Sequence, residues 1–385
     1  MLQKKIYNYL CYHINVLREQ FIDFWYYSNR KYTSNTLLII KTDAIGDYII
    51  FRNFLAEIKS SDKYKNFRII LCGNELWKDI ALTFDSAYVD QFVWIDPQRL
   101  INKEYKRNVE IELYDLKAEI VIYPSYSRTQ ESDGLVIRSG AKKKIGFLGD
   151  NRNMLADRKL MNDRRYSQLI PVKNNTSFEF DRYVDFFSFF LSSKIKLQSP
   201  FLKQKNIQEN KIVFCPGSSS GLRRWSIESF HKIAVLLKEN NMDFKINICG
   251  NIKEAYLAQS FSRILPNIEF YDYTKTLNLV EFIDFVSDAK LVVTNDSGPL
   301  HIAAACNVNV VCISNGNNFG RFLPYPIKIN HKVKTVFPEL LYGLENDSKK
   351  VSYYQNTDSK IDINSVTVEQ VLLCIRSILS ENYVN

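Results

Sequence analysis

Residues 293–305 join a short apolar strand to a helix through a turn, and this unit constrains the fold more than any other part of the chain. The run at 291–294 is apolar and β-branched, as buried strands are. Gly298 lets another group approach the backbone closely, and Pro299 suits the first position of a helix. Helix-forming residues then continue over 302–305. The backbone N–H groups at the start of such a helix favour anions.

The same alternation of apolar runs and amphipathic segments extends along most of the chain. In the first half it predicts a helix over 48–59 and strands over 37–40, 67–71, 91–95, 119–123 and 144–147. In the second half it predicts strands over 211–215, 244–249, 291–294 and 308–313, with helices over 226–240, 253–263, 279–287 and 299–306. Between the two series lies a polar and aromatic stretch with a helix-like segment at 182–191. Such alternation is typical of parallel-sheet α/β domains.

The length of 385 residues, with 46% hydrophobic content, is enough for two ordinary domains. We expect an N-terminal domain over 36–190, a linker over 191–210 and a C-terminal domain over 211–345. A polar tail over 346–385 contains an amphipathic helix at 366–379. This helix can return to the first domain or pack on the second.

The first 35 residues resemble an appendage to these domains. Apolar residues recur there at steps of three and four, which predicts one long amphipathic helix, and basic residues outnumber acidic ones. A basic amphipathic helix with aromatic residues can lie in a membrane interface. The same apolar stripe can instead pack on the protein itself or on a second subunit.

Composition narrows the cellular setting and the partners. The seven cysteines are scattered without C-x-x-C spacing, so we expect buried thiols in a reducing compartment and neither disulfides nor zinc. Because no apolar stretch reaches a bilayer's width and no signal peptide is evident, we expect a cytoplasmic protein. The formal charge of +9 suits nucleic acid, anionic lipid or a phosphorylated substrate. No nucleic-acid recognition motif is present, so that partner is not expected.

Ligands of open parallel sheets bind beyond the carboxyl ends of the strands, and three turns at such positions are rich in donors or carboxylates. The turn at 41–47 ends in Gly46 and Asp47, where the carboxylate can act on a ligand or cap the helix. The turn at 215–229 combines glycines, serines and arginines: Gly217, Gly221, Ser218, Ser219, Ser220, Arg223 and Arg224. It matches neither the P-loop nor G-x-G-x-x-G, and it suits a diphosphate or is a solvated basic loop.

The third turn is the one at 295–301. Asp296, Ser297, Gly298 and His301 surround the start of the following helix. Asp296 can bind a ligand or cap this helix, and His301 can be a ligand-binding or a purely structural residue. All three turns fall where ligands of this architecture bind, which favours a shared binding function.

Four sequence blocks resemble glycosyltransferase family 9, whose best-known members are the bacterial lipopolysaccharide heptosyltransferases. They are LIIKTDAIGD at 38–47, GAKKKIGF at 140–147, PGS at 216–218 with RRW at 223–225, and NDSGPLHIAA at 295–304. The resemblance implies a GT-B fold, in which two Rossmann-like domains bind the acceptor and the nucleotide sugar. It also implies inverting transfer without a metal or other cofactor, and no D-x-D pair is placed to hold a metal.

The resemblance also implies roles for individual residues. Asp47 would be the general base, and Arg223 would assist catalysis by stabilising the leaving diphosphate. The implied donor-binding residues are Gly217, Ser218, Ser219, Arg224, Asp296, Ser297, Gly298 and His301. The implied acceptor-binding residues are Asp43, Gly46 and Arg128.

Two departures from the family pattern leave the donor sugar open. Arg223 stands where the family usually has lysine, and a planar guanidinium binds with a different geometry from an ammonium. Asp43 replaces a small hydroxyl residue and adds a carboxylate that can bind an acceptor hydroxyl. The expected pathway is lipopolysaccharide, O-antigen or capsule assembly, with a glycan or lipid-linked acceptor at the inner face of the bacterial inner membrane.

Two other functions use the same features. A sugar-nucleotide epimerase of GT-B-like fold would use the same donor pocket but needs acid and base groups beside the donor sugar. A noncatalytic sugar-nucleotide or phosphate-binding protein would not need Asp47.

Overall fold

The computed structural model describes residues 14, 31–173, 178–239, 244–356 and 358–381. Nearly all of the helix expected within residues 1–35 therefore lies outside the described residues. Within the described residues, no helix combines the length and the apolar character needed to cross a bilayer. All six described cysteines are free, and five of them are buried, as expected for these positions.

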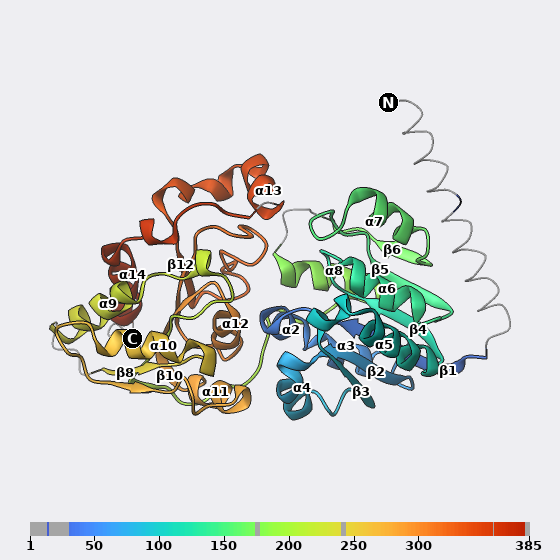
Figure 1. Ribbon diagram of the computed structural model, residues 1–385, viewed down its shortest axis with the longest axis horizontal. Helices are drawn as coiled ribbons and strands as arrows, with labels where there is room; N and C mark the ends of the chain where they lie inside the picture. The colour runs from blue at the N-terminus through green and yellow to red at the C-terminus, as the bar shows by residue number, and fades with distance from the viewer. Residues whose placement is uncertain (1–13, 15–30, 174–177, 240–243, 357, 382–385) are drawn as a thin grey trace. The chain divides into compact units, whose positions relative to one another are not determined.

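Contacts divide the chain into two compact units. The first unit comprises residues 1–42, 62–75 and 89–171, and the second comprises 43–61, 76–88 and 172–385. Each unit contains one parallel sheet of six strands (Figure 1). Each unit combines separate segments of the sequence, whereas each predicted domain is one continuous segment. The predicted domain boundaries therefore stay a prediction.

The sheet of the first unit is built from strands that run almost continuously apolar. Its strands are β1 Thr33–Lys41, β2 Arg68–Asn74, β3 Gln91–Ile95, β4 Ala118–Tyr123, β5 Lys143–Phe147 and β6 Gln168–Ile170, in the order β3-β2-β1-β4-β5-β6. Helices α5 (Lys103–Asp115) and α6 (Gln130–Arg138) share a hydrophobic core with β1 to β4. Helix α7 (Ala156–Asp163) packs beside α6. Continuous apolar runs are expected of strands buried on both faces.

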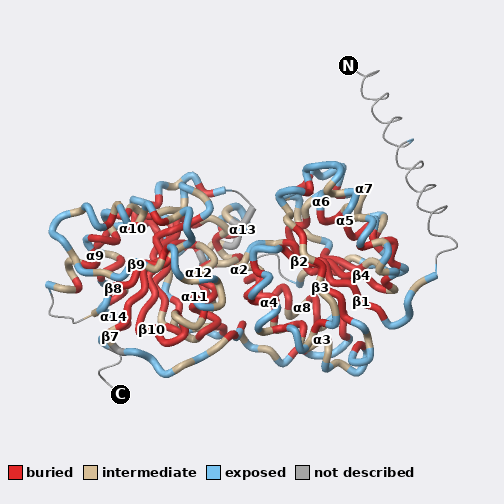
Figure 2. Tube along the Cα trace, turned by 60° about the horizontal axis from the view of Figure 1, so that its bottom comes forward, coloured by how far each residue is buried: buried red, intermediate tan, exposed pale blue. Residues whose placement is uncertain are grey.

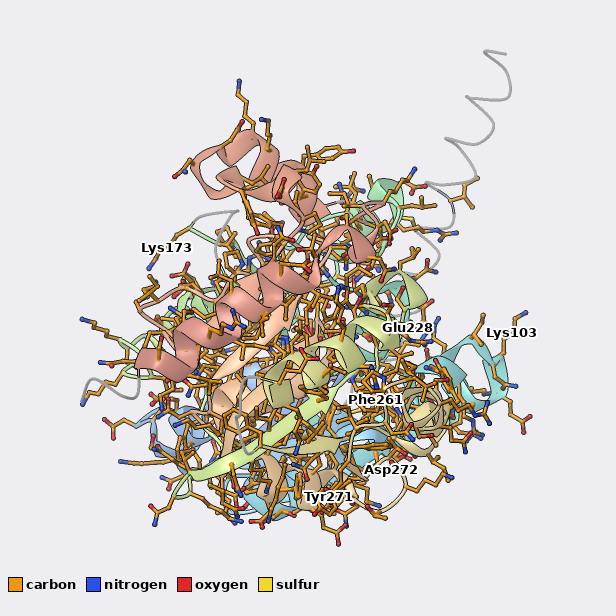
Figure 3. The ribbon with its side chains drawn as sticks, turned by 90° about the vertical axis from the view of Figure 1, so that its left-hand side faces the viewer. Lys103, Lys173, Glu228, Phe261, Tyr271 and Asp272 are labelled. Carbon is orange, nitrogen blue, oxygen red and sulfur yellow. The ribbon has the colours of Figure 1, made fainter. Side chains whose placement is uncertain are left out.

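The sheet of the second unit repeats this order. Its strands are β7 Gln208–Cys215, β8 Lys245–Ile248, β9 Phe270–Asp272, β10 Ala289–Asn295, β11 Val310–Ile313 and β12 Val333–Val336, in the order β12-β11-β10-β7-β8-β9. The helices that follow these strands are α9 Ile227–Glu239, α10 Ala255–Ser262, α11 Leu279–Val286 and α12 Gly298–Ala305. The strands form the buried centre of the unit (Figure 2). Phe261 of α10 is buried in this core, whereas Tyr271 in the edge strand β9 is 44% exposed (Figure 3).

The second unit also contains helices that come before the first strand or after the last strand of its sheet in the sequence. Four come earlier in the chain, namely α2 Ile45–Phe51, α3 Phe54–Ser60, α4 Lys78–Phe84 and α8 Glu179–Leu191. Two come from the tail, α13 Ser348–Asn356 and α14 Val368–Glu381. Helix α14 packs with α9 in the core of the second sheet, and Trp225 Nε1 donates to Val366 O at 2.8 Å just before it. The tail helix thus packs locally on the second sheet, one of the two arrangements that its sequence left open.

The alternation of strands and helices predicted from the sequence is confirmed for the long elements. The predicted single helix over 48–59 is wrong, because it consists of α2 and α3. Asn53 stands at the break and exchanges hydrogen bonds of 3.0 and 2.8 Å with the backbone of Phe201. The sequence pattern missed α5, which buries only Val109 and Leu113, and the short edge strands β6, β9 and β12. A narrow apolar stripe and three- or four-residue strands carry little periodic signal.

Candidate active site

Each sheet has a topological switch point, where ligands of doubly wound folds bind. In the first sheet this point lies between β1 and β4, and in the second it lies between β7 and β10, because successive strands there run outward in opposite directions. The turn after β7 contains residues 216–225, and the turn after β10 leads into α12. Two of the three turns singled out from the sequence therefore meet at the switch point of the second sheet.

Two buried side chains connect these turns into one scaffold. Asn295, the last residue of β10, accepts from Trp225 N at 3.2 Å and donates to Pro216 O at 2.7 Å. Both residues are buried: Asn295 is fully buried, and Trp225 is 2% exposed. Ser226 directly precedes α9, and its hydroxyl accepts from Ser229 N at 3.1 Å in the first turn. The turn after β7 is therefore held at both ends.

The two arginines of this turn are fixed by hydrogen bonds within the site. Arg223 donates from Nη2 to Ser219 Oγ at 3.0 Å and from Nη1 to Asp296 O at 3.3 Å. Arg224 donates from Nε to Ser218 O at 2.9 Å and from Nη1 to Tyr256 OH at 2.7 Å. The guanidinium of Arg223 is thereby held at Asp296, just before α12, where a helix end already favours negative charge, and that of Arg224 is held within the turn after β7.

Two polar atoms are buried here without a hydrogen bond. Among the described residues, neither Ser218 Oγ nor Asp296 Oδ2 has a hydrogen-bond partner, and Arg223 Nη1 lies 3.9 Å from Asp296 Oδ2. Burial raises the pKa of Asp296 to about 6, while the charge of Arg223 opposes that rise. A buried polar group left unpaired costs about 1–3 kcal/mol, so these atoms are suited to a polar ligand group.

Neither Asp296 nor Asp47 is the N-cap that the sequence allowed. Ser297 precedes α12 and Ala44 precedes α2, and neither makes a capping hydrogen bond through its side chain. Asp47 is the third residue of α2, in the first turn, where the helix dipole favours a carboxylate. The functional alternatives for both carboxylates therefore remain.

Helices α2 and α12 lie side by side within the second unit (Figures 1 and 2). Gly46 and His301 lie at their contact. A Cβ atom added to Gly46 would lie 2.5 Å from His301 Cδ2, so only glycine permits this approach. The predicted acceptor residue Gly46 thus adjoins the predicted donor residue His301. Gly298, at the start of α12, faces Ile45 in the same interface.

His301 is buried and joined to a tyrosine. Its Nδ1 lies 2.6 Å from the hydroxyl of Tyr325, within a hydrogen bond. Burial lowers the pKa of His301 to about 3, so the imidazole is neutral near neutral pH. The histidine is therefore uncharged and hydrogen-bonded through Nδ1, and its part in donor binding stays a prediction.

Asp43 and Asp47 lie near the buried side chain of Tyr183 in α8. The pKa of Tyr183 is raised well above its ordinary value by burial, then by the charges of Glu179, Asp43 and Asp47. Trp77 Nε1 donates to the backbone oxygen of Asp43 at 3.0 Å, and the ring of Trp77 stacks on Tyr48. These contacts hold the turn with Asp43 and the start of α2 with Asp47.

Arg128, the remaining predicted acceptor residue, belongs to the first unit, whereas the other predicted site residues belong to the second. It follows β4 and is buried between two carboxylates, paired with Asp163 and 3.6 Å from Asp133. Its guanidinium also lies 4.8 Å from the centre of the Tyr166 ring. Its Nε and Nη1 atoms have no hydrogen-bond partner among the described residues. A role in acceptor binding stays a prediction.

Sequence reasoning missed Glu254, at the end of the loop after β8. A Cβ atom on Gly217 would overlap the Glu254 carboxylate, which accepts from Asn251 N at 2.9 Å. Asn251 and Glu254 form a capping box, and the spacing N-x-x-E after a strand could have revealed it. In the described parts of the chain, no group of three or more His, Cys, Asp or Glu side chains is arranged to hold a metal ion.

The family model described as glycosyltransferase family 9 (heptosyltransferase) matches residues 130–336, more than half of the 385-residue chain. The chain belongs to glycosyltransferase family 9. This glycosyltransferase is 25% identical over 345 residues to lipooligosaccharide heptosyltransferase 2 of Haemophilus influenzae, with 81% of this chain and 96% of that protein covered. It is 28% identical over 175 residues to lipopolysaccharide heptosyltransferase 2 of Salmonella typhimurium, covering 44% and 47% of the two chains.

Solved structures agree with the fold of this glycosyltransferase. A family 9 glycosyltransferase from Veillonella parvula superposes with a TM-score of 0.68 at 17% identity, covering 91% of this chain and 99% of that one. ADP-heptose lipopolysaccharide heptosyltransferase II of E. coli superposes with a TM-score of 0.63 at 16% identity, covering 90% and 99%. The predicted α/β class and GT-B fold, with two Rossmann-like sheets, are therefore confirmed.

Proposed function

We propose that this glycosyltransferase transfers a heptose-like sugar from an ADP-linked donor to a hydroxyl of a lipopolysaccharide-core saccharide, with inversion and without a metal. The observation that carries the proposal is the pair of unpartnered buried atoms, Ser218 Oγ and Asp296 Oδ2, beside two arginines at the β7–β10 switch point. The names of relatives support the substrates, since they are lipooligosaccharide heptosyltransferases, and an E. coli heptosyltransferase of similar fold was solved with ADP.

In this proposal the donor diphosphate binds at the turn after β7 and the start of α12. Arg223 and Arg224 face this region with Ser218, Ser219 and the backbone near Gly298. As the bond between the anomeric carbon and the phosphate oxygen breaks, negative charge grows on that oxygen. Preorganised cationic and N–H donors stabilise such charge without a metal. Asp296 would accept a hydrogen bond from a sugar hydroxyl through its unpartnered oxygen.

Asp47 would act as the general base. Its carboxylate takes the proton of the acceptor hydroxyl while that oxygen attacks the anomeric carbon from the face opposite the leaving diphosphate, through an oxocarbenium-like state. One new glycosidic bond forms, the nucleoside diphosphate leaves with the electron pair, and the configuration inverts. The position of Asp47 in the first turn of α2, next to the Gly46 contact with α12, supports this role. Asp43 would bind a hydroxyl of the acceptor.

The proposed setting is the inner face of the bacterial inner membrane, where a lipid-linked acceptor would be glycosylated. The formal charge of +9 supports attraction to an anionic surface. O-antigen or capsule assembly would need the same chemistry with another acceptor.

The test incubates ADP-heptose and other sugar nucleotides with lipopolysaccharide-core acceptors and identifies products by mass spectrometry and NMR. We expect one donor to give an inverted glycoside, with a rate that EDTA leaves unchanged. Asp47→Asn should lower kcat roughly 10²- to 10⁴-fold while donor affinity is kept. An isomerised donor without transfer would identify an epimerase, unaltered donor that still binds would identify a binding protein, and loss of rate with EDTA would refute metal independence.

A further inference from the structure

We propose that the His301–Tyr325 pair is a positioning device that sets the separation between the helix bearing Asp47 and the helix at the donor turn. This inference rests on the proposed function of Asp47. It assigns His301 a role through Gly46, in place of direct contact with the donor. Tyr325, which the sequence did not single out, becomes a positioning residue for the reaction.

The first step is the contact between His301 and Gly46. The imidazole edge occupies the space into which a side chain at position 46 would project, with His301 Cδ2 2.5 Å and Nε2 3.2 Å from an added Cβ. Gly46 has no positive φ, so the backbone conformation does not demand glycine. Glycine is needed for space alone, and the flat ring acts as the spacer between the first turns of α2 and α12.

The second step is what holds the ring. Tyr325 OH lies 2.6 Å from His301 Nδ1, and both side chains are 5% exposed. A ring bonded at one nitrogen and buried among other side chains has one orientation. Since burial keeps the imidazole neutral, it adds no charge between Asp47 and Asp296.

The third step is what holds Tyr325. Its ring packs edge-on against Phe178 at 4.8 Å between centroids. The next residue, Glu179, is 1% exposed and binds Arg321 through two hydrogen bonds, at 2.8 and 3.2 Å. Glu179 N also donates to Arg321 O at 2.8 Å. The loop with Tyr325 is thereby fixed to the start of α8, where the charges of Asp43 and Asp47 contribute to the raised pKa of Tyr183.

The consequence concerns the position of the base. Asp47 follows Gly46 directly, so a change in the ring position moves the carboxylate relative to the donor turn. A general base must reach the acceptor proton within hydrogen-bond distance, and a misplacement of about 1 Å can cost about 10²-fold in rate. Loss of the pair should therefore lower kcat, while donor binding at Arg223 and Ser218 continues.

Two substitutions at His301 separate the halves of the device. Asn keeps a polar atom where Nδ1 stood and removes the edge that touches Gly46, whereas Gln keeps reach toward Gly46 and loses the bond to Tyr325. Tyr325→Phe removes only the hydroxyl. We expect Tyr325→Phe and His301→Asn each to lower kcat about 10- to 100-fold with unchanged donor KM and unchanged melting temperature within a few degrees.

The decisive experiment is a double-mutant cycle between positions 46 and 301. Gly46→Ala alone should overlap the imidazole and lower kcat about 10²-fold, whereas in the His301→Asn background the added methyl has space and should cost little. Ile302→Val, a conservative change at a buried position of the same helix outside the predicted site, serves as the control for general damage to α12. Additive effects of Gly46→Ala and His301→Asn would overturn the proposal.

Asp47→Asn separates failure of this inference from failure of the proposed function. If Asp47→Asn is inactive while Tyr325→Phe and both His301 variants keep wild-type kcat, the positioning role is wrong and the transferase mechanism stands. If Asp47→Asn keeps full kcat, the base assignment is wrong and the positioning role falls with it. If the variants raise donor KM and leave kcat unchanged, His301 contacts the donor, and the positioning role is overturned.

Discussion

The free energy of unfolding of the Asp296→Asn and His301→Asn variants should depend on pH in opposite directions. Asp296 has a pKa raised to about 6 from 3.8, and His301 has a pKa lowered to about 3 from 6.5. Burial is the larger cause for both groups, because it disfavours whichever form is charged.

The sign differs between the two groups. Between about pH 4 and 6, folded Asp296 keeps a proton that the unfolded chain has released, so this group makes the fold less stable as pH rises. In the same window, the unfolded chain holds a proton on His301 that the folded protein excludes, so this group makes the fold more stable as pH rises. Each proton changes the free energy of unfolding by about 1.4 kcal/mol per pH unit, so in the wild type the two contributions nearly cancel.

Each variant exposes the contribution of the group that remains. Relative to wild type, His301→Asn should lose about 2.5 kcal/mol as pH rises from 4 to 6, and Asp296→Asn should gain about 2 kcal/mol over the same range. Urea titrations at several pH values measure both, and any constant cost of a substitution drops out of the slope. Curves of both variants that stay parallel to wild type would refute the burial of these charges.

Two further predictions test the scaffold of the site, each with a matched control. Gly217→Ala should force Glu254 from its capping bond and destabilise the protein by about 1 kcal/mol, whereas Gly221→Ala, which meets nothing within 4 Å, should change the melting temperature little. Ile375→Ala should cost about 2–5 kcal/mol in urea unfolding because Ile375 is fully buried under the second sheet, whereas Leu373→Ala on the same helix, 72% exposed, should be nearly neutral. Equal effects within either pair would contradict the packing described.

Local pattern was sufficient for the long parallel strands and the turns that follow them. The runs that became β1, β7 and β10 are apolar and β-branched, and the glycines, serines and arginines stand directly after them. Strand order decides which carboxyl ends lie side by side, and local pattern does not reveal that order. These turns could therefore be predicted as binding sites only from the general rule that ligands of α/β sheets bind beyond the carboxyl ends of the strands. Helix α5 and the edge strand β9 were missed because a narrow apolar stripe and a three-residue strand carry little periodic signal.

The contacts that define the site were outside the reach of sequence pattern. The pair of Gly46 and His301 spans more than 250 positions, and nothing local to either residue indicates the other. Arg128 illustrates the converse, since a basic residue in a polar turn gives no sign of its burial between Asp133 and Asp163.

By itself, the sequence determined the α/β class, the family and the residue types available at each turn, because periodicity, turn chemistry and motif order are properties of neighbouring positions. Only the tertiary structure decided which of those residues are buried, neutral or unpartnered, and which helix start faces which. Burial and close approach depend on packing between distant segments, and it is packing that made Asp296 a raised-pKa carboxyl and His301 an uncharged spacer.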